Sequence, residues 1–354
     1  MSRFFSEKYS RLSPYVPGEQ PKDARYVKLN TNESPFPPSP KAREYAEQAK
    51  ENVQLYSDPE CTALKKAFCD VYDAAPDEVI FTNGSDEALN FAFMAFCDEK
   101  TGAAFPDITY GFYPVFAQLY GIDYLEIPLR DDFSIDTNDY KGLGRTIFIA
   151  NPNAPTGRTL SLSQIEEILE ANPDNVVVID EAYVDFGGDS AVGLIHRYDN
   201  LLVTQTFSKS RSLAGARLGF AIGSKDLIAD LNTLKFSTNP YNVNAVTQAM
   251  GRGALEDEAY TKANCRQIIK NRGYLTQELQ KLDFSVLDSK ANFVFARSDR
   301  IGGEALYRKL KERGVLIRHF NKERIKDYNR ITVGTEEQTE ILLKNIKEIL
   351  EEQS

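Results

Sequence analysis

Short apolar segments alternate with helix-like segments between residues 78 and 223, and no other feature of the sequence constrains the fold as strongly. Thr146–Ala150 (TIFIA) and Val176–Asp180 (VVVID) are apolar over most of their length, which is typical of strands buried on both faces of a sheet. Because the strands alternate with helices, βαβ units with parallel strands are expected. We predict an α/β fold in which a mostly parallel sheet lies between helices. Strands are expected at residues 78–82, 103–105, 123–127, 146–150, 176–180, 201–206 and 219–223, and helices at 41–52, 60–72, 87–97 and 163–170.

Both ends of the chain depart from this alternation. Residues 1–40 contain seven prolines, which resist helices and central strands, so we predict an extended N-terminal arm. After about residue 240 helices dominate, and strands at 284–287, 293–296 and 330–333 precede a C-terminal amphipathic helix. We therefore predict three units, namely an arm (1–40), a large domain that binds the cofactor inferred below (41–240) and a smaller α+β domain (241–354).

Composition argues against several classes of protein. The 354-residue chain has a formal net charge of −10, so a nucleic-acid partner is not expected. No apolar stretch is long enough to span a membrane, and residues 1–11 are polar, so we expect neither a membrane protein nor a secretory signal. The four cysteines lack the close pairing of metal sites and suit a reducing compartment. We expect a soluble, cytoplasmic protein.

The motifs of several common enzyme classes are missing. The sequence has no dinucleotide-binding glycine pattern after a strand, no P-loop, no HExxH motif and no GxSxG motif. Its two histidines, His196 and His319, are far apart in the sequence, which disfavours a histidine-based metal site or a serine–histidine triad. We therefore expect no metal, and we expect any demanding chemistry to need a cofactor.

Polar residues follow two predicted strands at the edge of the sheet where ligands of open α/β folds bind. The strand at 176–180 ends in Asp180, and Tyr183 follows three residues later. A carboxylate in this position can keep a pyridine nitrogen protonated, and a phenol can hydrogen-bond a ring oxygen. The strand at 201–206 precedes Lys209, and lysine is the residue that can form an imine with an aldehyde. Taken singly, Asp180 also fits a helix cap and Lys209 a solvated surface charge.

Two groups of residues suit a phosphate. Thr206 and Ser208 lie close to Lys209 in the sequence, with Arg217 eight residues after it, and hydroxyls with a forked guanidinium bind phosphate well. Phe81–Leu89 (FTNGSDEAL) combines a strand, a glycine turn and a helix start, which offers free backbone N–H groups, although Ser85 or Asp86 also fits a simple helix cap. Together the segments describe one ligand, a phosphorylated pyridine aldehyde.

Nine segments, in order along essentially the whole chain, resemble those of the histidinol-phosphate aminotransferase family, which has the fold of type I pyridoxal-phosphate aminotransferases. The segments are LNTNESPFPP from Leu29, YSDPE from Tyr56, TNGSDEAL from Thr82, ITYGFYPV from Ile108, NPNAPTG from Asn151, DEAYVDF from Asp180, FSKSRSLAGARLGF from Phe207, ANFVF from Ala291 and RITVGT from Arg330.

This resemblance implies a role for each site residue. Lys209 would hold pyridoxal 5'-phosphate as an imine and later carry the proton between substrate and cofactor. Asp180 would pair with the ring nitrogen, Tyr183 with the ring oxygen, and Tyr110 would stack on the ring. The implied phosphate contacts are Ser85, Asp86, Thr206, Ser208, Arg217 and, from the neighbouring subunit, Tyr56. The implied substrate contacts are Tyr15, Asn32, Arg318 and Arg330.

The resemblance also implies a homodimer with shared active sites, and the chain departs from the family at two positions. Ala154 replaces the asparagine that touches the ring oxygen, so either Asn153 compensates or Tyr183 makes this contact alone. Arg211 stands where an aromatic or small residue is common, and its extra charge bears on the identity of the substrate.

The implied reaction is transamination from a small-molecule amino donor to a 2-oxo acid. The pair indicated is histidinol phosphate and 2-oxoglutarate, giving imidazole-acetol phosphate and glutamate. An aromatic amino acid aminotransferase and a threonine-phosphate-decarboxylase-like enzyme are alternatives on the same scaffold. A non-catalytic ligand-binding regulator is a third alternative, but such proteins need an attached DNA-binding domain, for which no residues are left over.

Overall fold

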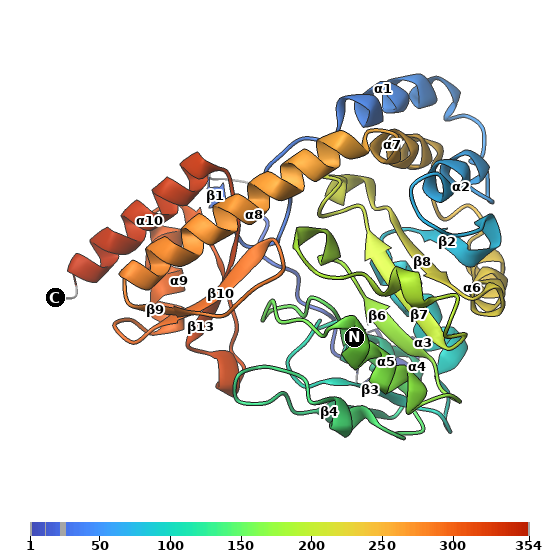
Figure 1. Ribbon diagram of the computed structural model, residues 1–354, viewed down its shortest axis with the longest axis horizontal. Coiled ribbons are helices and arrows are strands. Elements are labelled where there is room, and N and C mark those ends of the chain that lie inside the picture. The colour runs from blue at the N-terminus through green and yellow to red at the C-terminus, as the bar shows by residue number, and fades with distance from the viewer. Residues whose placement is uncertain (1, 11, 22–25, 353–354) are drawn as a thin grey trace.

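A seven-stranded sheet forms the centre of the computed structural model, which describes residues 2–10, 12–21 and 26–352. Its strand order is β2-β8-β7-β6-β5-β3-β4 (Figure 1). The strands are β2 (Val79–Thr82), β3 (Ala103–Pro106), β4 (Tyr124–Ile127), β5 (Thr146–Ala150), β6 (Val177–Asp180), β7 (Leu201–Thr206) and β8 (Gly219–Gly223). The predicted α/β class with a mostly parallel sheet is confirmed.

Only β8 runs against its neighbours, since it is antiparallel to both β2 and β7. The connection between β7 and β8, residues 207–218, contains one short 3-10 turn (Ala214–Ala216) and no α-helix. A parallel crossover needs about a dozen or more residues and usually a helix. Reversal of β8 brings its first residue to the same edge of the sheet at which β2, β6 and β7 end.

Alternate residues of each central strand enter two different apolar cores, which explains why these strands are apolar throughout. Val177 and Ile179 of β6 pack in one core, whereas Val178 packs in the other. The first core also contains side chains of α1 (Pro40–Ala49), α2 (Thr62–Cys69), α5 (Leu162–Glu170) and α7 (Ala245–Leu255). The second contains side chains of α3 (Ser85–Phe96), α4 (Tyr113–Tyr120) and α6 (Lys225–Thr238). Helices therefore cover both faces.

Two of these helices are absent from the sequence-based prediction. The segment of α4 (YPVFAQLY) is rich in aromatic residues, which have low helix propensity, and its helix is stabilised by burial of Tyr113 and Phe116. For α6, the apolar residues Leu227, Ile228 and Leu231 follow helical spacing, so the pattern was present but weak.

A second lobe contains a four-stranded antiparallel sheet with the order β12-β13-β10-β9. Its elements are α8 (Glu258–Lys281), β9 (Phe284–Val286), β10 (Phe293–Ser298), α9 (Gly303–Glu312), β11 (Val315–Leu316), β12 (Arg318–His319), β13 (Tyr328–Thr332) and α10 (Glu336–Glu351). The long helix α8 extends from the first lobe along the second (Figure 1). The predicted boundary at residue 240 assigns α7 to the small domain, but α7 packs against α1 and α2 of the first lobe.

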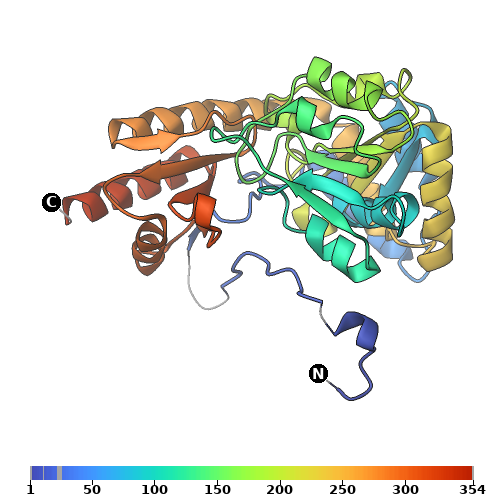
Figure 2. The ribbon, with the colours of Figure 1, turned by 90° about the horizontal axis from the view of Figure 1, so that it is seen from below.

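The N-terminal segment runs along one side of the two lobes (Figure 2), where Tyr15 stacks on Phe112 and Glu19 accepts hydrogen bonds from Tyr307 and Lys311. A 3-10 turn (Glu7–Tyr9) precedes residues 12–21, which have no regular structure. The short strand β1 (Val27–Lys28) then pairs with β11, and Leu29 packs in the core of the second lobe. Parts of the predicted arm (residues 1, 11 and 22–25) and the end of the predicted small domain (353–354) lie outside the described residues. Within the described part of the chain, no helix has the length and apolar character required to cross a membrane.

Phe148, at the centre of β5, provides a test of this core. It is fully buried and its ring stacks on Phe93 of α3 with 4.0 Å between centroids. We expect Phe148→Ala to lower the free energy of unfolding by about 3–5 kcal/mol, because it removes buried contacts and leaves a cavity. Leu125→Ala, at an exposed position of β4, should change it by about 0.5 kcal/mol or less. Urea unfolding of both variants checks this, and equal effects would contradict the assignment of the core.

Candidate active site

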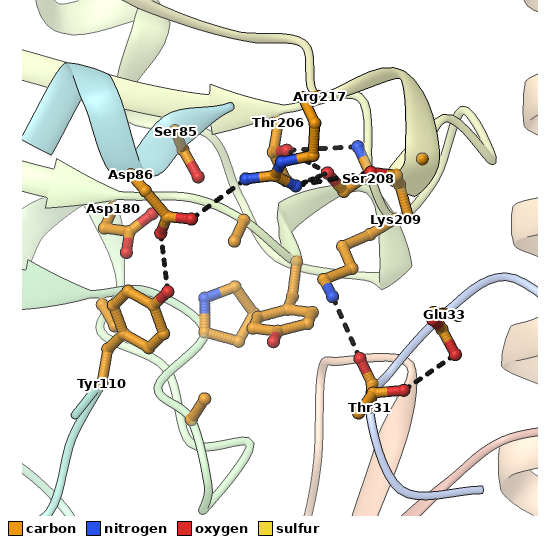
Figure 3. Close-up of a pocket in the computed structure, with 17 residues that line it drawn as sticks. Thr31, Glu33, Ser85, Asp86, Tyr110, Asp180, Thr206, Ser208, Lys209 and Arg217 are labelled. Carbon is orange, nitrogen blue, oxygen red and sulfur yellow. Dashed lines mark hydrogen bonds and ion pairs between the residues drawn. The ribbon is translucent and has the colours of Figure 1, made fainter. Parts of the chain in front are cut away.

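A cavity of about 340 Å³ lies at the edge of the sheet where β2, β6 and β7 end and β8 begins, within the size range of small-molecule sites (Figure 3). Its lining residues are Thr31, Glu33, Ser85, Asp86, Tyr110, Ala150, Pro152, Ala154, Asp180, Ala182, Tyr183, Thr206, Ser208, Lys209, Ala214, Gly215 and Arg217. A second cavity adjoins it and shares Thr31, Tyr110, Ala154, Tyr183 and Lys209. We call these the first and the second cavity.

Lys209 lies where the two cavities meet. It follows the end of β7, and its Nζ donates a hydrogen bond to the carbonyl oxygen of Thr31 at 3.2 Å. The amine also lies 5.8 Å from the centroid of the Tyr183 ring. Loss of water around the amine, reinforced by the positive charge of Arg330, lowers the pKa of Lys209 to about 8. A substantial fraction of this amine is therefore neutral, and nucleophilic, slightly above neutral pH.

Asp180 is the buried carboxylate of the first cavity. It is the last residue of β6 and accepts hydrogen bonds from the Tyr113 hydroxyl at 3.0 Å and from Thr204 Oγ1 at 3.2 Å. Burial raises the pKa of Asp180 to about 6, against the lowering effect of these two hydrogen bonds. A cationic partner in the cavity would favour the ionised form, so the site is suited to a positively charged ring nitrogen.

Tyr183 and Asn32 form a polar contact on the wall between the cavities. Asn32 Nδ2 donates to the Tyr183 hydroxyl at 3.0 Å, and the ring of Tyr183 packs edge-on against Phe293. Asn32 is itself held by Thr332, whose Oγ1 accepts from the Asn32 backbone N–H at 3.0 Å. Residues of the N-terminal segment, the large sheet and the second lobe therefore meet at this tyrosine.

A group of donors at one end of the first cavity is arranged for an anion. Ser85 begins α3, and its N-cap residue Gly84 has no side chain that could satisfy the first N–H groups of the helix. Arg217 Nη1 lies 3.5 Å from Ser208 Oγ, which in turn accepts from Thr206 Oγ1 at 3.0 Å. These side chains and the helix start surround one end of the cavity (Figure 3).

Two glycines make this close arrangement possible. A Cβ at Gly84, which has a φ of +76°, would lie 2.4 Å from Arg217 Nη2. A Cβ at Gly219 would lie 2.3 Å from the backbone nitrogen of Ser85. Both distances are too short for non-bonded atoms. Glycine is therefore needed at both positions if the Arg217 guanidinium and the start of α3 are to contact one anion together.

Asp86 connects this group to Tyr110. Its carboxylate accepts from the Tyr110 hydroxyl at 2.6 Å and pairs with Arg217 at 3.1 Å. Burial and the charge of Asp86 hold the pKa of Tyr110 well above its ordinary value, so the phenol remains protonated. The side chain of Asp86 thereby orients both the arginine and the tyrosine, a role that the sequence did not indicate.

The second cavity is cationic. Arg330 donates to the carbonyl oxygen of Asn30 at 2.9 Å, and no group among the described residues accepts a hydrogen bond from its buried Nε. Arg318 also lines this cavity, and so does Tyr15, whose ring stacks on Phe112 with 4.3 Å between centroids. Burial lowers the pKa of Arg330, although a guanidinium stays charged at any physiological pH. The unsatisfied Nε and the two charges suit an anionic substrate group.

Two predicted site residues do not reach either cavity within the described chain. The amide of Asn153 is occupied, because its Nδ2 donates to Ile108 O at 2.9 Å and to Thr156 Oγ1 at 3.0 Å, and its Oδ1 accepts from Thr109. Asn153 therefore has no free amide group with which to substitute for an asparagine at position 154. Tyr56 is 84% exposed and stacks on Tyr241 at the surface.

Arg211 also lies away from the substrate region. It is not among the described residues that line either cavity, and it is buried against Tyr72 and Asp185. Contrary to the expectation from the sequence, the charge of Arg211 therefore does not bear on the substrate.

Tyr113 and Thr204 were missed by the sequence analysis, although both hydrogen-bond Asp180. The sequence did contain an indication for Thr204. Alternate residues of a strand share a face, and Thr204 lies two residues before Thr206, which was predicted to contact the phosphate. Tyr113 reaches Asp180 from α4, a helix that was not predicted. Glu33 and Thr31 were missed for a different reason, since only the tertiary structure brings the N-terminal segment to Lys209.

Comparison with known proteins identifies relatives along the whole chain. The family model described as aminotransferase class I and II matches residues 24–346. The chain is 48% identical over 352 residues to a histidinol-phosphate aminotransferase of Brachyspira hyodysenteriae, covering 99% of each. It is 48% identical over 351 residues to a histidinol-phosphate aminotransferase of Clostridium botulinum, again covering 99% of each. The crystal structure of a histidinol-phosphate aminotransferase from Sinorhizobium meliloti in complex with pyridoxal-5'-phosphate has the same fold, with a TM-score of 0.91, 22% identity, and coverage of 100% of this chain and 99% of the other.

The lowered pKa of Lys209 predicts how its reactivity depends on pH. Only the neutral amine attacks an aldehyde, so the rate at which the cofactor-free protein captures pyridoxal 5'-phosphate should increase with pH and level off above a midpoint of about 8, rather than near 10.5. Arg330→Gln removes a neighbouring cation and should move this midpoint to higher pH. Stopped-flow absorbance measures the rate.

Arg197→Gln serves as the matched control, because the Arg197 side chain is exposed and pairs with Glu166 on the surface. Its midpoint should equal that of the unmodified protein. A midpoint near the ordinary lysine pKa in the unmodified protein would show that the amine is not shielded from water as described.

Proposed function

Because the chain belongs to the class I and II aminotransferases, we propose that it transfers the amino group of histidinol phosphate to 2-oxoglutarate, giving imidazole-acetol phosphate and glutamate. The observation that carries this proposal is the position of the Lys209 amine. It lies where a cavity with a buried carboxylate and an anion cradle meets a cavity with two arginines.

The first cavity fits pyridoxal 5'-phosphate. The Gly84 and Gly219 positions leave room for a phosphate among the start of α3, Ser208 and Arg217, and Thr206 supports Ser208. Asp180 would hold the protonated ring nitrogen, Tyr183 the ring oxygen, and Tyr110 a face of the ring. When bound, pyridoxal 5'-phosphate supplies an aldehyde for the amine and a protonated ring that withdraws electrons from the substrate α-carbon.

Lys209 supplies the nucleophile and the proton carrier of this chemistry. Its neutral amine would hold the cofactor through the aldehyde carbon, and once free it would act as the general base for the α-proton of the donor. The Thr31 carbonyl, 3.2 Å from Nζ, gives the displaced amine a hydrogen-bond acceptor. Asp180 would keep the ring nitrogen charged, and Tyr113 and Thr204 fix the direction of its carboxylate.

The second cavity suits both proposed substrates. Histidinol phosphate carries a phosphate and 2-oxoglutarate carries two carboxylates. Arg330 and Arg318, which line this cavity, would bind an anionic group of either substrate in turn. Tyr15 and Asn32 border the same space and would position the remainder of the donor.

We also propose that the enzyme is a homodimer whose two subunits share each active site. Tyr56 is 84% exposed, and Val53 and Leu55 beside it are 62% and 64% exposed. A group of neighbouring apolar side chains in contact with water is typical of a protein–protein interface. In a dimer, Tyr56 would reach the cofactor phosphate of the neighbouring subunit, and the N-terminal arm, with exposed Phe4, would lie against that subunit. A cytoplasmic location is proposed as well, because all four cysteines are free thiols.

Measurement of glutamate formation from 2-oxoglutarate with three amino donors tests the reaction. We expect histidinol phosphate to give the highest kcat/KM, with phenylalanine and threonine phosphate lower by about tenfold or more, because phenylalanine offers no phosphate and threonine phosphate no imidazole. Lys209→Ala should lower kcat by at least about 100-fold, since it removes both nucleophile and base. Absence of turnover with histidinol phosphate would refute the substrate assignment, and turnover of phenylalanine alone would favour an aromatic aminotransferase.

Mixed dimers test whether the sites are shared. Lys209→Ala and Tyr56→Ala chains are each expected to be impaired, but a mixed dimer has one site with both residues intact. Equal co-expression should therefore restore roughly a quarter of the unmodified activity, because half of the dimers are mixed and each has one complete site. Activity that stays at the average of the two separate variants would exclude a contribution of Tyr56 across the interface.

A further inference from the structure

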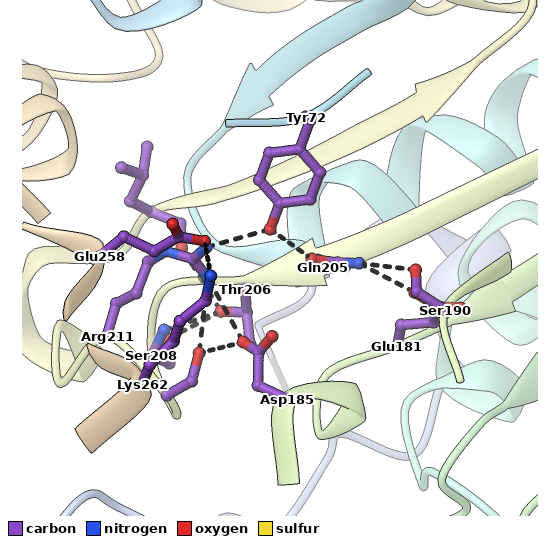
Figure 4. A network of polar contacts seen from close by, with 12 residues as sticks. Tyr72, Glu181, Asp185, Ser190, Gln205, Thr206, Ser208, Arg211, Glu258 and Lys262 are labelled. Carbon is purple, nitrogen blue, oxygen red and sulfur yellow. Dashed lines mark hydrogen bonds and ion pairs between the residues drawn. The ribbon is translucent and has the colours of Figure 1, made fainter. Parts of the chain in front are cut away.

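A buried polar network lies beside the Lys209 loop, outside both cavities (Figure 4). Its members include Tyr72, Glu181, Asp185, Gln205, Ser210 and Arg211. Glu181, Gln205 and Arg211 are all less than one-tenth exposed. Polar groups are expensive to bury, so a network of this extent needs a physical reason.

Arg211 is the charged centre of the network. Its guanidinium pairs with the Asp185 carboxylate at 3.3 Å, donates to the Tyr72 hydroxyl at 3.1 Å and lies 5.1 Å from the centroid of the Phe207 ring. A buried arginine is tolerated only if it is paired and hydrogen-bonded, and these contacts fulfil both conditions.

One end of the network joins two loops of the active site. Asp185 follows Tyr183 by two residues, and its carboxylate accepts from Ser210 Oγ as well as from Arg211. Ser210 and Arg211 are the two residues after Lys209. Asp185 therefore links the backbone next to the reactive lysine to the loop that carries Tyr183.

The other end of the network includes Glu181, the residue that follows Asp180. The Tyr72 hydroxyl donates to Gln205 Oε1 at 3.0 Å, and Gln205 Nε2 donates to Glu181 Oε2 at 2.8 Å. Glu181 is the neighbour of Asp180, and its carboxylate also accepts from the Ala191 N–H at 2.6 Å. A continuous set of contacts thus runs from the residue beside Asp180 to the residues beside Lys209.

We propose that Arg211 is a positioning residue, which through Asp185 and Tyr72 fixes the loop of Lys209 relative to the strand end of Asp180 and the loop of Tyr183. This inference rests on the proposed function. The lysine amine would have to bind the cofactor carbon and later leave it, so its side chain must be able to move and cannot be held by many hydrogen bonds. Among the described residues its only hydrogen bond is to Thr31. Anchoring the adjacent residues holds its backbone while the side chain stays free to move.

The test separates placement of Lys209 from non-covalent binding of the cofactor. Pyridoxal 5'-phosphate forms an imine when Lys209 Nζ bonds to the aldehyde carbon and water leaves. Deoxypyridoxine 5'-phosphate has no aldehyde, so its binding reports on the non-covalent contacts of the phosphate and the ring and does not depend on imine formation by Lys209. For Arg211→Met and the milder Tyr72→Phe, we expect unchanged affinity for deoxypyridoxine 5'-phosphate, with imine formation slowed about tenfold or more in Arg211→Met and a few-fold in Tyr72→Phe.

Turnover gives a second readout. Misplacement of Lys209 should lower kcat with little change in the KM for histidinol phosphate, because the network does not include Arg318 and Arg330 of the second cavity. Arg211→Lys keeps the charge opposite Asp185 but lacks the fork that also reaches Tyr72, so it should recover part of the loss. Arg197→Met, at an exposed arginine, is the matched control and should behave as the unmodified enzyme in every assay.

The outcomes distinguish this inference from the proposed function. Failure of the unmodified protein to form an imine would refute the proposed function itself. Normal imine formation and kcat in Tyr72→Phe and Arg211→Met would refute only the positioning role. The positioning role would also be refuted if the variants lost thermal stability and affinity for deoxypyridoxine 5'-phosphate together, because Arg211 would then merely stabilise the fold. Tyr72→Phe, which removes a single hydroxyl, keeps the test valid if Arg211→Met does not fold.

Discussion

Three charged groups are held out of bulk water at one edge of the sheet, and much of the surrounding structure serves to compensate them. Lys209, Asp180 and Arg330 are each costly to shield from water, and each is placed by a different part of the chain. The fold offsets the cost with oriented partners, such as Tyr113 and Thr204 at Asp180 and the Thr31 carbonyl at Lys209. The Nε of Arg330 has no hydrogen-bond acceptor among the described residues, so it is free to donate to an anionic ligand.

The direction of the strands explains how these groups meet. β2, β6 and β7 end at this edge, and the antiparallel β8 begins there. Arg217, two residues before β8, therefore lies at the same edge and pairs with Asp86 at the start of α3. Side chains of successive residues point to opposite faces. Asp180 therefore faces the cavity while Glu181 joins the network of Tyr72 and Arg211, and the same division separates Thr204 from Gln205 on β7.

Arg211 illustrates how sequence position and spatial role can diverge. Because Arg211 lies two residues after the reactive lysine, its charge was expected to affect the choice of substrate. Its side chain is instead buried against Asp185 and Tyr72, away from both cavities. Asn153 diverges in the same way, since its amide is already satisfied by neighbouring loop residues. In both cases the deciding factor is the hydrogen-bonding need of a buried polar group, which is settled by neighbours that are distant in the sequence.

Local sequence patterns were enough to predict the α/β class, the strands that carry the site and the types of residue that follow them. These features arise from local patterns, namely apolar periodicity and the residues at strand ends. The direction of β8 and the contacts of Tyr113 and Thr204 with Asp180 became apparent from the folded chain. The same holds for the position of Thr31 and Glu33 beside Lys209 and for the burial of Arg211 in a polar network. These outcomes depend on contacts between residues far apart in the chain, and neither spacing nor composition specifies such contacts.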